Sequence, residues 1–199
     1  MVRQRLVVLC VLIFGASLTS ASELEQSADS YTVKAAYLMN FARFVTWPEG
    51  SFQAEKSPLV IGILDTDPFQ GALTAVLDGR EIHGRPVHIK LVTGRDLTSK
   101  VHLLFIPETV RWVDHPWQRK VREGGILTIG ESEETFVEGT VITLVQEGKR
   151  IKFRVNLDLA TDSLLKIGSR MLHAAEKVQG QPNPSAQTVK TNNPEVRGE

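Results

Sequence analysis

The sequence predicts an α/β fold, a single-domain sandwich in which helices flank a mixed β-sheet. Three observations predict it. Short, continuously apolar runs recur along the chain, and such runs form parallel core strands buried on both faces. Segments with helical apolar spacing or helix-start signals separate these runs, as they do in α/β folds. Towards the C-terminal end, two alternating runs flank Glu147-Gly148, which predicts a C-terminal antiparallel hairpin in the same sheet.

The first expected element is a helix over Tyr31–Trp47, ended by Pro48. Apolar residues recur in it at steps of four and three, which gives one stripe: Val33, Tyr37, Phe41 and Phe44. A buried strand is expected over Leu59–Leu64. After it, Asp67 suits the N-cap of a second helix that runs to Leu77, with Pro68 at the first helical position and Gln70 at the third.

The remaining elements are expected in the following order. Strands lie over Val87–Val92, Val101–Ile106 and Gly125–Ile129, and a helix over Val110–Val121 is interrupted at Pro116. The hairpin arms are Thr140–Gln146 and Lys149–Val155, with Ile151, Phe153 and Val155 on one face, and a closing helix runs from about Leu157 to Lys177.

The two ends of the chain have different compositions from its middle. Residues 1–21 have the pattern of a cleaved secretory signal peptide: Arg3 and Arg5 precede the apolar run Leu6–Leu18, and small residues end at Ala21. The apolar run is shorter than the roughly 20 residues that a spanning helix needs. We therefore expect export, a folded domain over residues 30–178, a solvated tail over residues 179–199, and no membrane insertion of the mature chain.

Composition excludes several classes of protein. The chain has 199 residues, 42% of them hydrophobic, so it can bury a core and is not disordered throughout. Its 23 basic and 23 acidic residues balance, and removal of Arg3 and Arg5 leaves a slight acidic excess. Such a charge gives no long-range attraction to phosphate backbones, so nucleic acid is not an expected partner. Cys10 is the only cysteine and lies within the signal segment, so the mature chain can form no disulfide.

The search for catalytic motifs finds none that is complete. Ser163-Leu164-Leu165-Lys166 has the Ser-x-x-Lys spacing of penicillin-binding enzymes but lacks their companion motifs. No pair of histidines has the spacing of helical metal ligands. We therefore predict no catalytic residue, no metal and no cofactor.

Three residues are candidate ligand contacts: Asp65, Asp67 and Arg85. The two aspartates follow a buried strand, at the strand end where α/β proteins bind ligands, although Asp67 is equally explained as a helix cap.

Two groups of residues are candidates for a partner surface. The aromatic residues of the first helix form either core or an exposed docking site: Tyr37, Phe41, Phe44 and Trp47. The acidic run is either an ordinary solvated face or a docking patch: Glu131, Glu133 and Glu134.

The sequence resembles the YfiR-like family of periplasmic proteins over about Tyr31–Val178. The resemblance rests on motifs in matching order, the first of which is Val33-Lys34-Ala35-Ala36-Tyr37-Leu38-Met39-Asn40-Phe41-Ala42-Arg43-Phe44-Val45-Thr46-Trp47-Pro48. The others include Ile82-His83-Gly84-Arg85-Pro86-Val87, Leu103-Leu104-Phe105-Ile106, Phe153-Arg154-Val155-Asn156 and Leu164-Leu165-Lys166-Ile167-Gly168-Ser169. Relatives often carry a cysteine where this chain has Val101, so control through a disulfide is not expected here.

The resemblance implies a non-enzymatic regulator in the periplasm. Its expected partner is the periplasmic sensor region of an inner-membrane diguanylate cyclase, which it represses, and an OmpA-like lipoprotein of the outer membrane can sequester it. Loss of repression then raises cyclic di-GMP and favours biofilm. The sequence leaves open whether the protein forms a homodimer. The alternatives are a periplasmic small-molecule binding protein and, further off, a hydrolase of unrecognised type.

Overall fold

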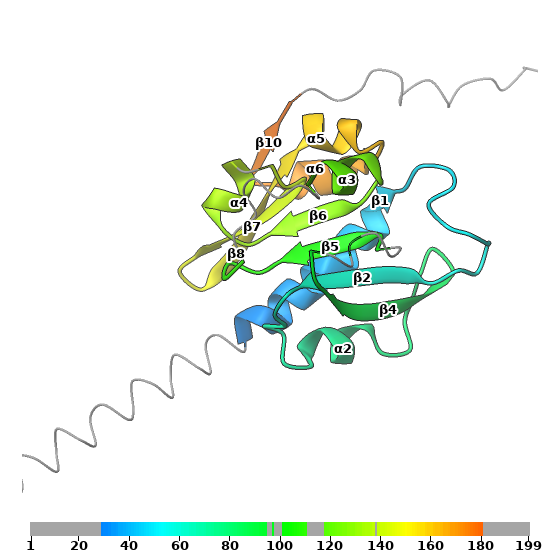
Figure 1. The fold of residues 1–199 in the computed structure, drawn as a ribbon. Coiled ribbons are helices and arrows are strands. Elements are labelled where there is room, and N and C mark those ends of the chain that lie inside the picture. Colours follow the sequence, from blue (N-terminus) through cyan, green and yellow to red (C-terminus); the bar gives the residue numbers. More distant parts are fainter. Residues whose placement is uncertain (1–28, 95–96, 98–100, 111–117, 138, 181–199) are drawn as a thin grey trace, which may run out of the picture.

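The computed structural model describes residues 29–94, 97, 101–110, 118–137 and 139–180. Its main feature is an eight-stranded, twisted, mixed sheet with helices packed against both faces (Figure 1). The strands lie in the order β10-β8-β7-β6-β5-β2-β4-β3. The predicted α/β fold is therefore confirmed. The segments expected to be signal peptide and tail lie outside the described residues, except that the edge strand β10 (Lys177–Gln179) ends one residue beyond the expected domain.

The centre of the sheet is parallel, as the apolar runs predict. Neighbouring strands from β4 through β2, β5 and β6 to β7 are parallel. Antiparallel pairing occurs between β7 and β8 and between β3 and β4, whereas β10 is parallel to β8. The bounds are β2 Leu59–Leu64, β3 Glu81–Ile82, β4 Arg85–Val92, β5 Leu103–Ile106, β6 Leu127–Gly130, β7 Ile142–Glu147 and β8 Arg150–Asn156. Every residue of β2, β5 and β6 is buried, which confirms their predicted two-sided burial.

Helices cover the two faces unequally. The first helix (residues 29–44, the N-terminal helix below) packs on one face, and Ile61 and Ile63 of β2 point towards it. Val60 and Leu64, which alternate with them, belong to a second cluster on the other face. The remaining helices are α2 Ala72–Leu77, α3 Gln118–Glu123, α4 Glu133–Val137, α5 Leu157–Asp162 and α6 Ser169–Ala174.

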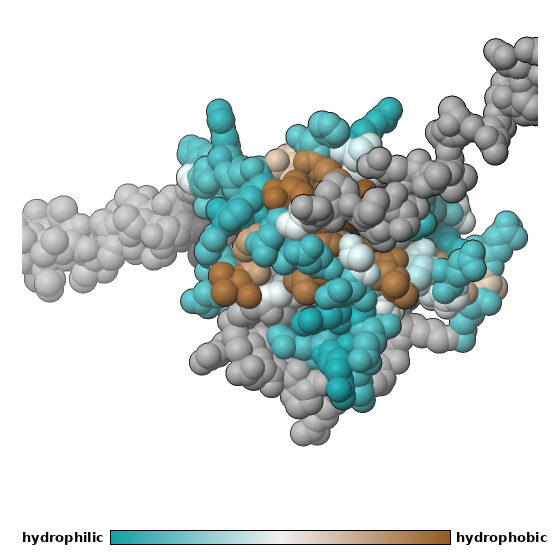
Figure 2. Space-filling view, turned by 90° about the horizontal axis from the view of Figure 1, so that it is seen from above, coloured by the Kyte–Doolittle hydropathy of each residue, from teal (hydrophilic) through white to brown (hydrophobic). Residues whose placement is uncertain are grey.

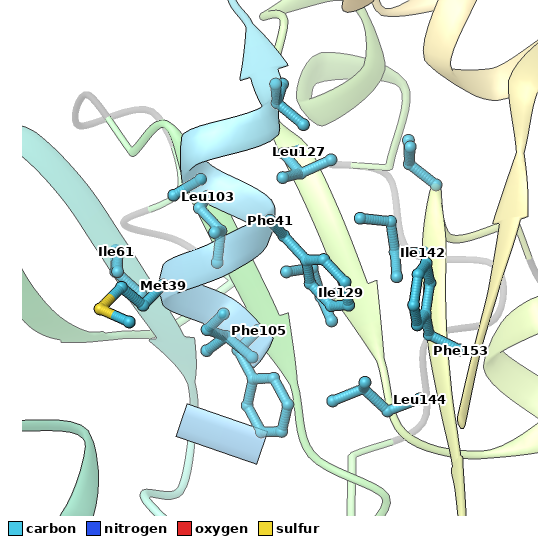
Figure 3. Close-up of a cluster of buried hydrophobic side chains, with 14 of the residues drawn as sticks. Met39, Phe41, Ile61, Leu103, Phe105, Leu127, Ile129, Ile142, Leu144 and Phe153 are labelled. Carbon is cyan, nitrogen blue, oxygen red and sulfur yellow. The ribbon is translucent and has the colours of Figure 1, made fainter. Parts of the chain in front are cut away.

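The N-terminal helix buries a face that differs from the predicted stripe. Phe41 is buried, and its ring centroid lies 4.9 Å from that of Phe153 on β8 (Figure 3), so its expected place in the core is confirmed. The helix face that meets the sheet, however, is formed by small and aliphatic residues: Ala35, Leu38, Ala42 and the adjoining Val45. The short alanine side chains let the helix approach the strands closely. Val33 and Phe44 are consequently turned outward, 46% and 39% exposed.

Two expected helices are corrected by the structure. The second helix begins at Ala72 with Gly71 as N-cap, because the Asp67 carboxylate closes a local turn by accepting the Phe69 N–H at 2.8 Å. Residues 157–177 do not form one helix. Helix α5 ends at Asp162, Leu164 has a φ of 56°, and the short strand β9 (Lys166–Ile167) pairs with β1 (Val45–Thr46) before α6 begins.

Smaller differences concern the turns. The hairpin turn is Gly148-Lys149 rather than Glu147-Gly148, and Gly148 has a φ of 60° that suits glycine. Of the interrupted helix expected over Val110–Val121, the structure contains α3 from Gln118; residues 111–117 lie outside the described ranges.

Candidate functional site

The carboxyl ends of three parallel strands carry a buried polar cluster. β2, β5 and β6 end at the same edge of the sheet, and Glu131 directly follows β6. Its carboxylate accepts hydrogen bonds from Lys34 Nζ at 2.6 Å, the Tyr31 hydroxyl at 2.9 Å and the Glu108 N–H at 2.9 Å. The side chains of Lys34 and Glu131 are 9% and 1% exposed.

This cluster is a clamp between the N-terminal helix and the sheet. Tyr31 and Lys34 come from the first turns of the helix, and the Lys34 ammonium lies 4.2 Å from the centre of the Tyr31 ring. Burial raises the pKa of Tyr31 far above its usual range, and the nearby Glu131 carboxylate raises that pKa further. Both predicted roles of Glu131, solvated face and docking patch, are therefore wrong, because a buried carboxylate with three donors is neither.

The three candidate ligand contacts do not come together. Asp65 and Asp67 are exposed at the carboxyl edge of the sheet. Arg85 begins β4, which is parallel to β2, so it lies at the opposite edge. There its guanidinium stacks on Phe52 at 3.8 Å and donates to the carbonyls of Ala54 and Ser57, holding the loop before β2.

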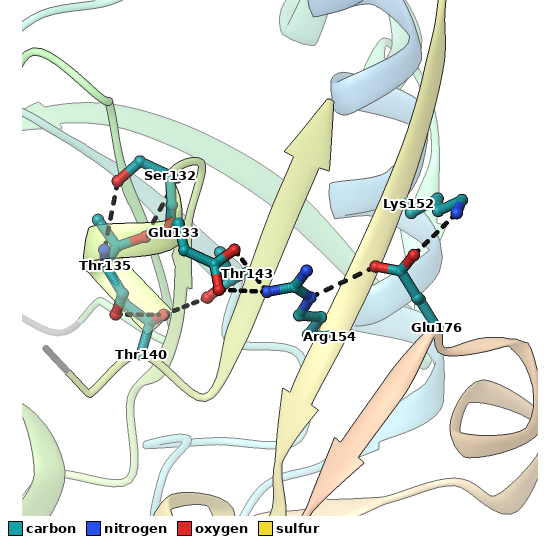
Figure 4. Close-up of polar contacts among 8 residues, drawn as sticks. All are labelled: Ser132, Glu133, Thr135, Thr140, Thr143, Lys152, Arg154 and Glu176. Carbon is teal, nitrogen blue, oxygen red and sulfur yellow. Dashed lines mark hydrogen bonds and ion pairs between the residues drawn. The ribbon is translucent and has the colours of Figure 1, made fainter. Parts of the chain in front are cut away.

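The other two glutamates of the acidic run lie on α4. Glu133 pairs with Arg154 on β8, and Arg154 also donates to Glu176 at 3.3 Å (Figure 4). Lys152 donates to the same Glu176 carboxylate at 2.8 Å. Glu133 thus joins an exposed ion-pair network, and Glu134 stays exposed beside it.

The two-stranded sheet of β1 and β9 lies at the amino edge and unites two distant segments. Val45 is paired with Ile167, and Thr46 with Lys166. Trp47, just after β1, is buried and its Nε1–H donates to the His102 carbonyl at 3.0 Å. Among the four aromatic candidates for a partner surface, Phe41 and Trp47 are buried, Tyr37 is half-buried with its hydroxyl bonded to the Ile151 carbonyl, and Phe44 is exposed.

Beside Phe44, this small sheet exposes residues that sequence reasoning did not select. Leu164 is 67% exposed although its backbone is left-handed, and Lys166 and Thr46 are exposed on the paired strands. We call Phe44, Thr46, Leu164 and Lys166 the ribbon surface. The doublet Leu164-Leu165 gives no local signal for this surface, because two adjacent leucines do not indicate which one is buried; in the structure Leu165 is buried and Leu164 is exposed. On the face that Figure 2 shows, apolar residues come to the surface in several groups among polar ones.

The comparisons with known proteins give one family match. Residues 31–176 match the family described as YfiR/HmsC-like. The chain belongs to the YfiR/HmsC-like family. A search among curated proteins finds no match for it.

The matched part of this YfiR/HmsC-like chain contains the buried polar cluster around Glu131, the ion-pair network around Arg154 and the two-stranded sheet of β1 and β9. Within the described ranges, no three His, Cys, Asp or Glu side chains gather closely enough to hold a metal ion. Over the same ranges, no helix has the length and apolar character needed to cross a bilayer.

Proposed function

We propose that this YfiR/HmsC-like protein is an exported, non-enzymatic regulator that binds the periplasmic sensor region of an inner-membrane diguanylate cyclase and restrains the enzyme. The observation that carries the proposal is the family match over residues 31–176. The signal pattern of residues 1–21 supports export. An OmpA-like lipoprotein is the proposed antagonist, which would remove the protein from the cyclase.

We assign the docking of the cyclase to the ribbon surface. Phe44 and Leu164 are exposed apolar side chains, and an aromatic or aliphatic side chain that fills a pocket of the partner can anchor an interface. Leu164 is the more informative of the two. A non-glycine residue in left-handed backbone costs on the order of 1 kcal/mol, and this leucine contributes little to the core in return. A partner that buries it supplies the missing compensation.

The test uses variants that leave the core intact. Leu164→Asp and Phe44→Ser each place a polar group on the ribbon surface, whereas Val137→Asp alters an 81% exposed valine on α4 and is the matched control. Binding of each purified variant to the purified periplasmic sensor region of the cyclase is measured by calorimetry. We expect the two ribbon variants to weaken binding at least tenfold and the control to bind like the unaltered protein. No binding by the unaltered protein would overturn the proposed function, and equal binding by all variants would overturn the assignment of the surface.

A further inference from the structure

The outer edge of β4 is open along most of its length (Figure 1). β3 pairs only with Arg85 and Pro86, and among the described residues no strand pairs with the outer edge of Val87–Val92. Beside this edge lies a groove of about 670 Å³, bounded by the chain from Leu77 to Glu81 and by residues 86–90 of β4. Just beyond the groove, Leu91 is 61% exposed.

The hydrogen bonds show which backbone groups point outward. Leu64 is in register with Val92, and the Asp65 N–H donates to the Val92 carbonyl at 2.8 Å, so Val92 bonds towards β2. In a parallel ladder, alternate residues direct their backbone groups to the same neighbour, so His88 and Lys90 also bond towards β2. Val87, Ile89 and Leu91 then point their N–H and C=O groups to the open side, in agreement with the pairing of Arg85 to β3 on that side.

We propose that β4 pairs antiparallel with β4 of a second copy of this chain, about a two-fold axis at Ile89. This register uses the outward-pointing groups of Val87, Ile89 and Leu91 in both copies. In this register Ile89 lies opposite Ile89 of the second copy, and Val87 lies opposite Leu91 of the second copy. Every pair on the face that carries these side chains is therefore apolar. Leu91 of each copy enters the groove of the other, beside Val87 and Leu77, which makes the contact self-complementary as a two-fold interface requires.

Charge complementarity favours the same occupant. Glu81 is opposite Pro86, so the two side chains share a face, and His88 and Lys90 lie on that face as well. In the proposed register, Lys90 of the second copy lies opposite His88 and two positions along from Glu81. Each copy therefore offers one lysine to one glutamate of the other. Lys90 and Glu81 make no ion pair with any residue in the described part of the chain.

The proline and the lysine on β4, Pro86 and Lys90, are compatible with the proposed pairing. Lysine and proline commonly protect sheet edges from pairing. Pro86, however, precedes the open residues, and the N–H that it lacks would have pointed towards β2. Lys90 disfavours registers that place another Lys90 opposite it. β3 limits the ladder to the five residues from Val87 to Leu91. Glu81 of β3 already occupies the position opposite Pro86, so the strand of the second copy must leave the sheet after its Leu91.

Cysteine cross-linking tests the register directly, since Cys10 is the only native cysteine. Ile89→Cys, in a chain without Cys10, places two thiols opposite each other, with Cα atoms about 5.5 Å apart, which a disulfide can bridge. We expect mild oxidation to give a covalent dimer with Ile89→Cys, and little or none with Val87→Cys or Leu91→Cys. Cross-linking through Lys90→Cys in place of Ile89→Cys would overturn the register.

A second experiment tests the dimer itself by sedimentation equilibrium. Leu91→Pro removes only an outward-pointing N–H and an exposed side chain, so the fold should survive while pairing is lost. Glu81→Lys and Lys90→Glu should each weaken the dimer, and the two changes together should restore it. Val137→Asp is the control and should remain dimeric. A monomeric unaltered protein at about 100 μM, or a dimer that survives Leu91→Pro, would overturn the proposal, and neither result bears on binding to the cyclase.

Discussion

Breaking the buried pair between Lys34 and Glu131 should show how strongly the N-terminal helix depends on the sheet. Lys34→Met removes the ammonium and leaves a carboxylate whose side chain is 1% exposed. Loss of one partner of a buried ion pair costs about 3–5 kcal/mol. Because Glu131 keeps the donors Tyr31 and Glu108, we expect the lower end, about 3 kcal/mol.

Glu131→Gln should lower the free energy of unfolding by a similar amount, because it leaves the buried ammonium of Lys34 without its carboxylate partner. The double variant carries no charge at the site, and the glutamine oxygen can still accept from Tyr31 and Glu108. We therefore expect the double variant to cost no more than about 3 kcal/mol instead of the additive 6 or so, a coupling of about 3 kcal/mol.

Urea melts followed by circular dichroism measure these changes. With an m-value of about 2 kcal/mol/M, a loss of about 3 kcal/mol lowers the midpoint by about 1.5 M. Lys152→Met is the control, because Lys152 pairs with Glu147 and Glu176 but its side chain is 40% exposed; it should leave the urea midpoint nearly unchanged. The reasoning fails if Lys34→Met is as mild as the control, or if the two single changes are additive.

Further expectations concern the core, acid stability and processing. Phe41→Ala should cost about 3–5 kcal/mol in urea melts and Arg43→Ala less than about 0.5, since Phe41 is 2% exposed and Arg43 is exposed; a fully stable Phe41→Ala would contradict the packing on Phe153. The hydrogen bond from Lys152, with a smaller one from Arg154, lowers the pKa of Glu176, so its stabilising effect is present above about pH 4.5 and lost as pH falls below it. Glu176→Gln should therefore be less stable than the unaltered protein at pH 7 and low salt, and this difference should shrink as the pH falls below about 4.5; a difference that does not change with pH would contradict this. Mass spectrometry of the natively expressed protein should find an N-terminus at or near Ser22, and retention of Met1 would contradict export. The melting temperature of that mature protein should not change with reductant, because Cys10 is its only cysteine and lies before Ser22.

The central strands could be predicted from local pattern because their burial is a property of the strand itself. Leu59–Leu64 is apolar at consecutive positions, and only burial on both faces accommodates such a run. The hairpin was predictable for a similar reason, since alternation and a glycine turn are both local. The turn was misplaced by one residue because register depends on cross-strand packing, which the glycine alone does not fix.

The helix ends were harder to predict because short polar side chains stabilise more than one local structure. Asp67 can cap a helix or close a turn, and in this chain it closes a turn before Gly71. The stretch from Leu157 to Lys177 is rich in Leu, Ala and other residues that helices accept, yet the pairing of Lys166-Ile167 with β1 interrupts it. That partner lies far away in the sequence, so the local pattern does not reveal it; Gly168, which precedes α6, is the one local sign of a break.

The site residues were the least predictable part for the same reason. Glu131 resembles the solvated glutamates that follow it, and its burial is explained by distant donors such as Lys34, 97 positions earlier. Arg85 and Asp65 lie at opposite edges because β2 and β4 are parallel, a fact of topology rather than of composition. Leu164 became a candidate only when its backbone angle and exposure were known.

The central claim is that this YfiR/HmsC-like protein restrains a diguanylate cyclase from the periplasm. The most direct measurement is the cellular level of cyclic di-GMP in the source bacterium with the gene deleted, and then restored as the unaltered protein or as Leu164→Asp. We predict that deletion raises cyclic di-GMP, that the unaltered protein lowers it again, and that Leu164→Asp, expressed at the same level, does not. An unchanged level of cyclic di-GMP after deletion would contradict the account.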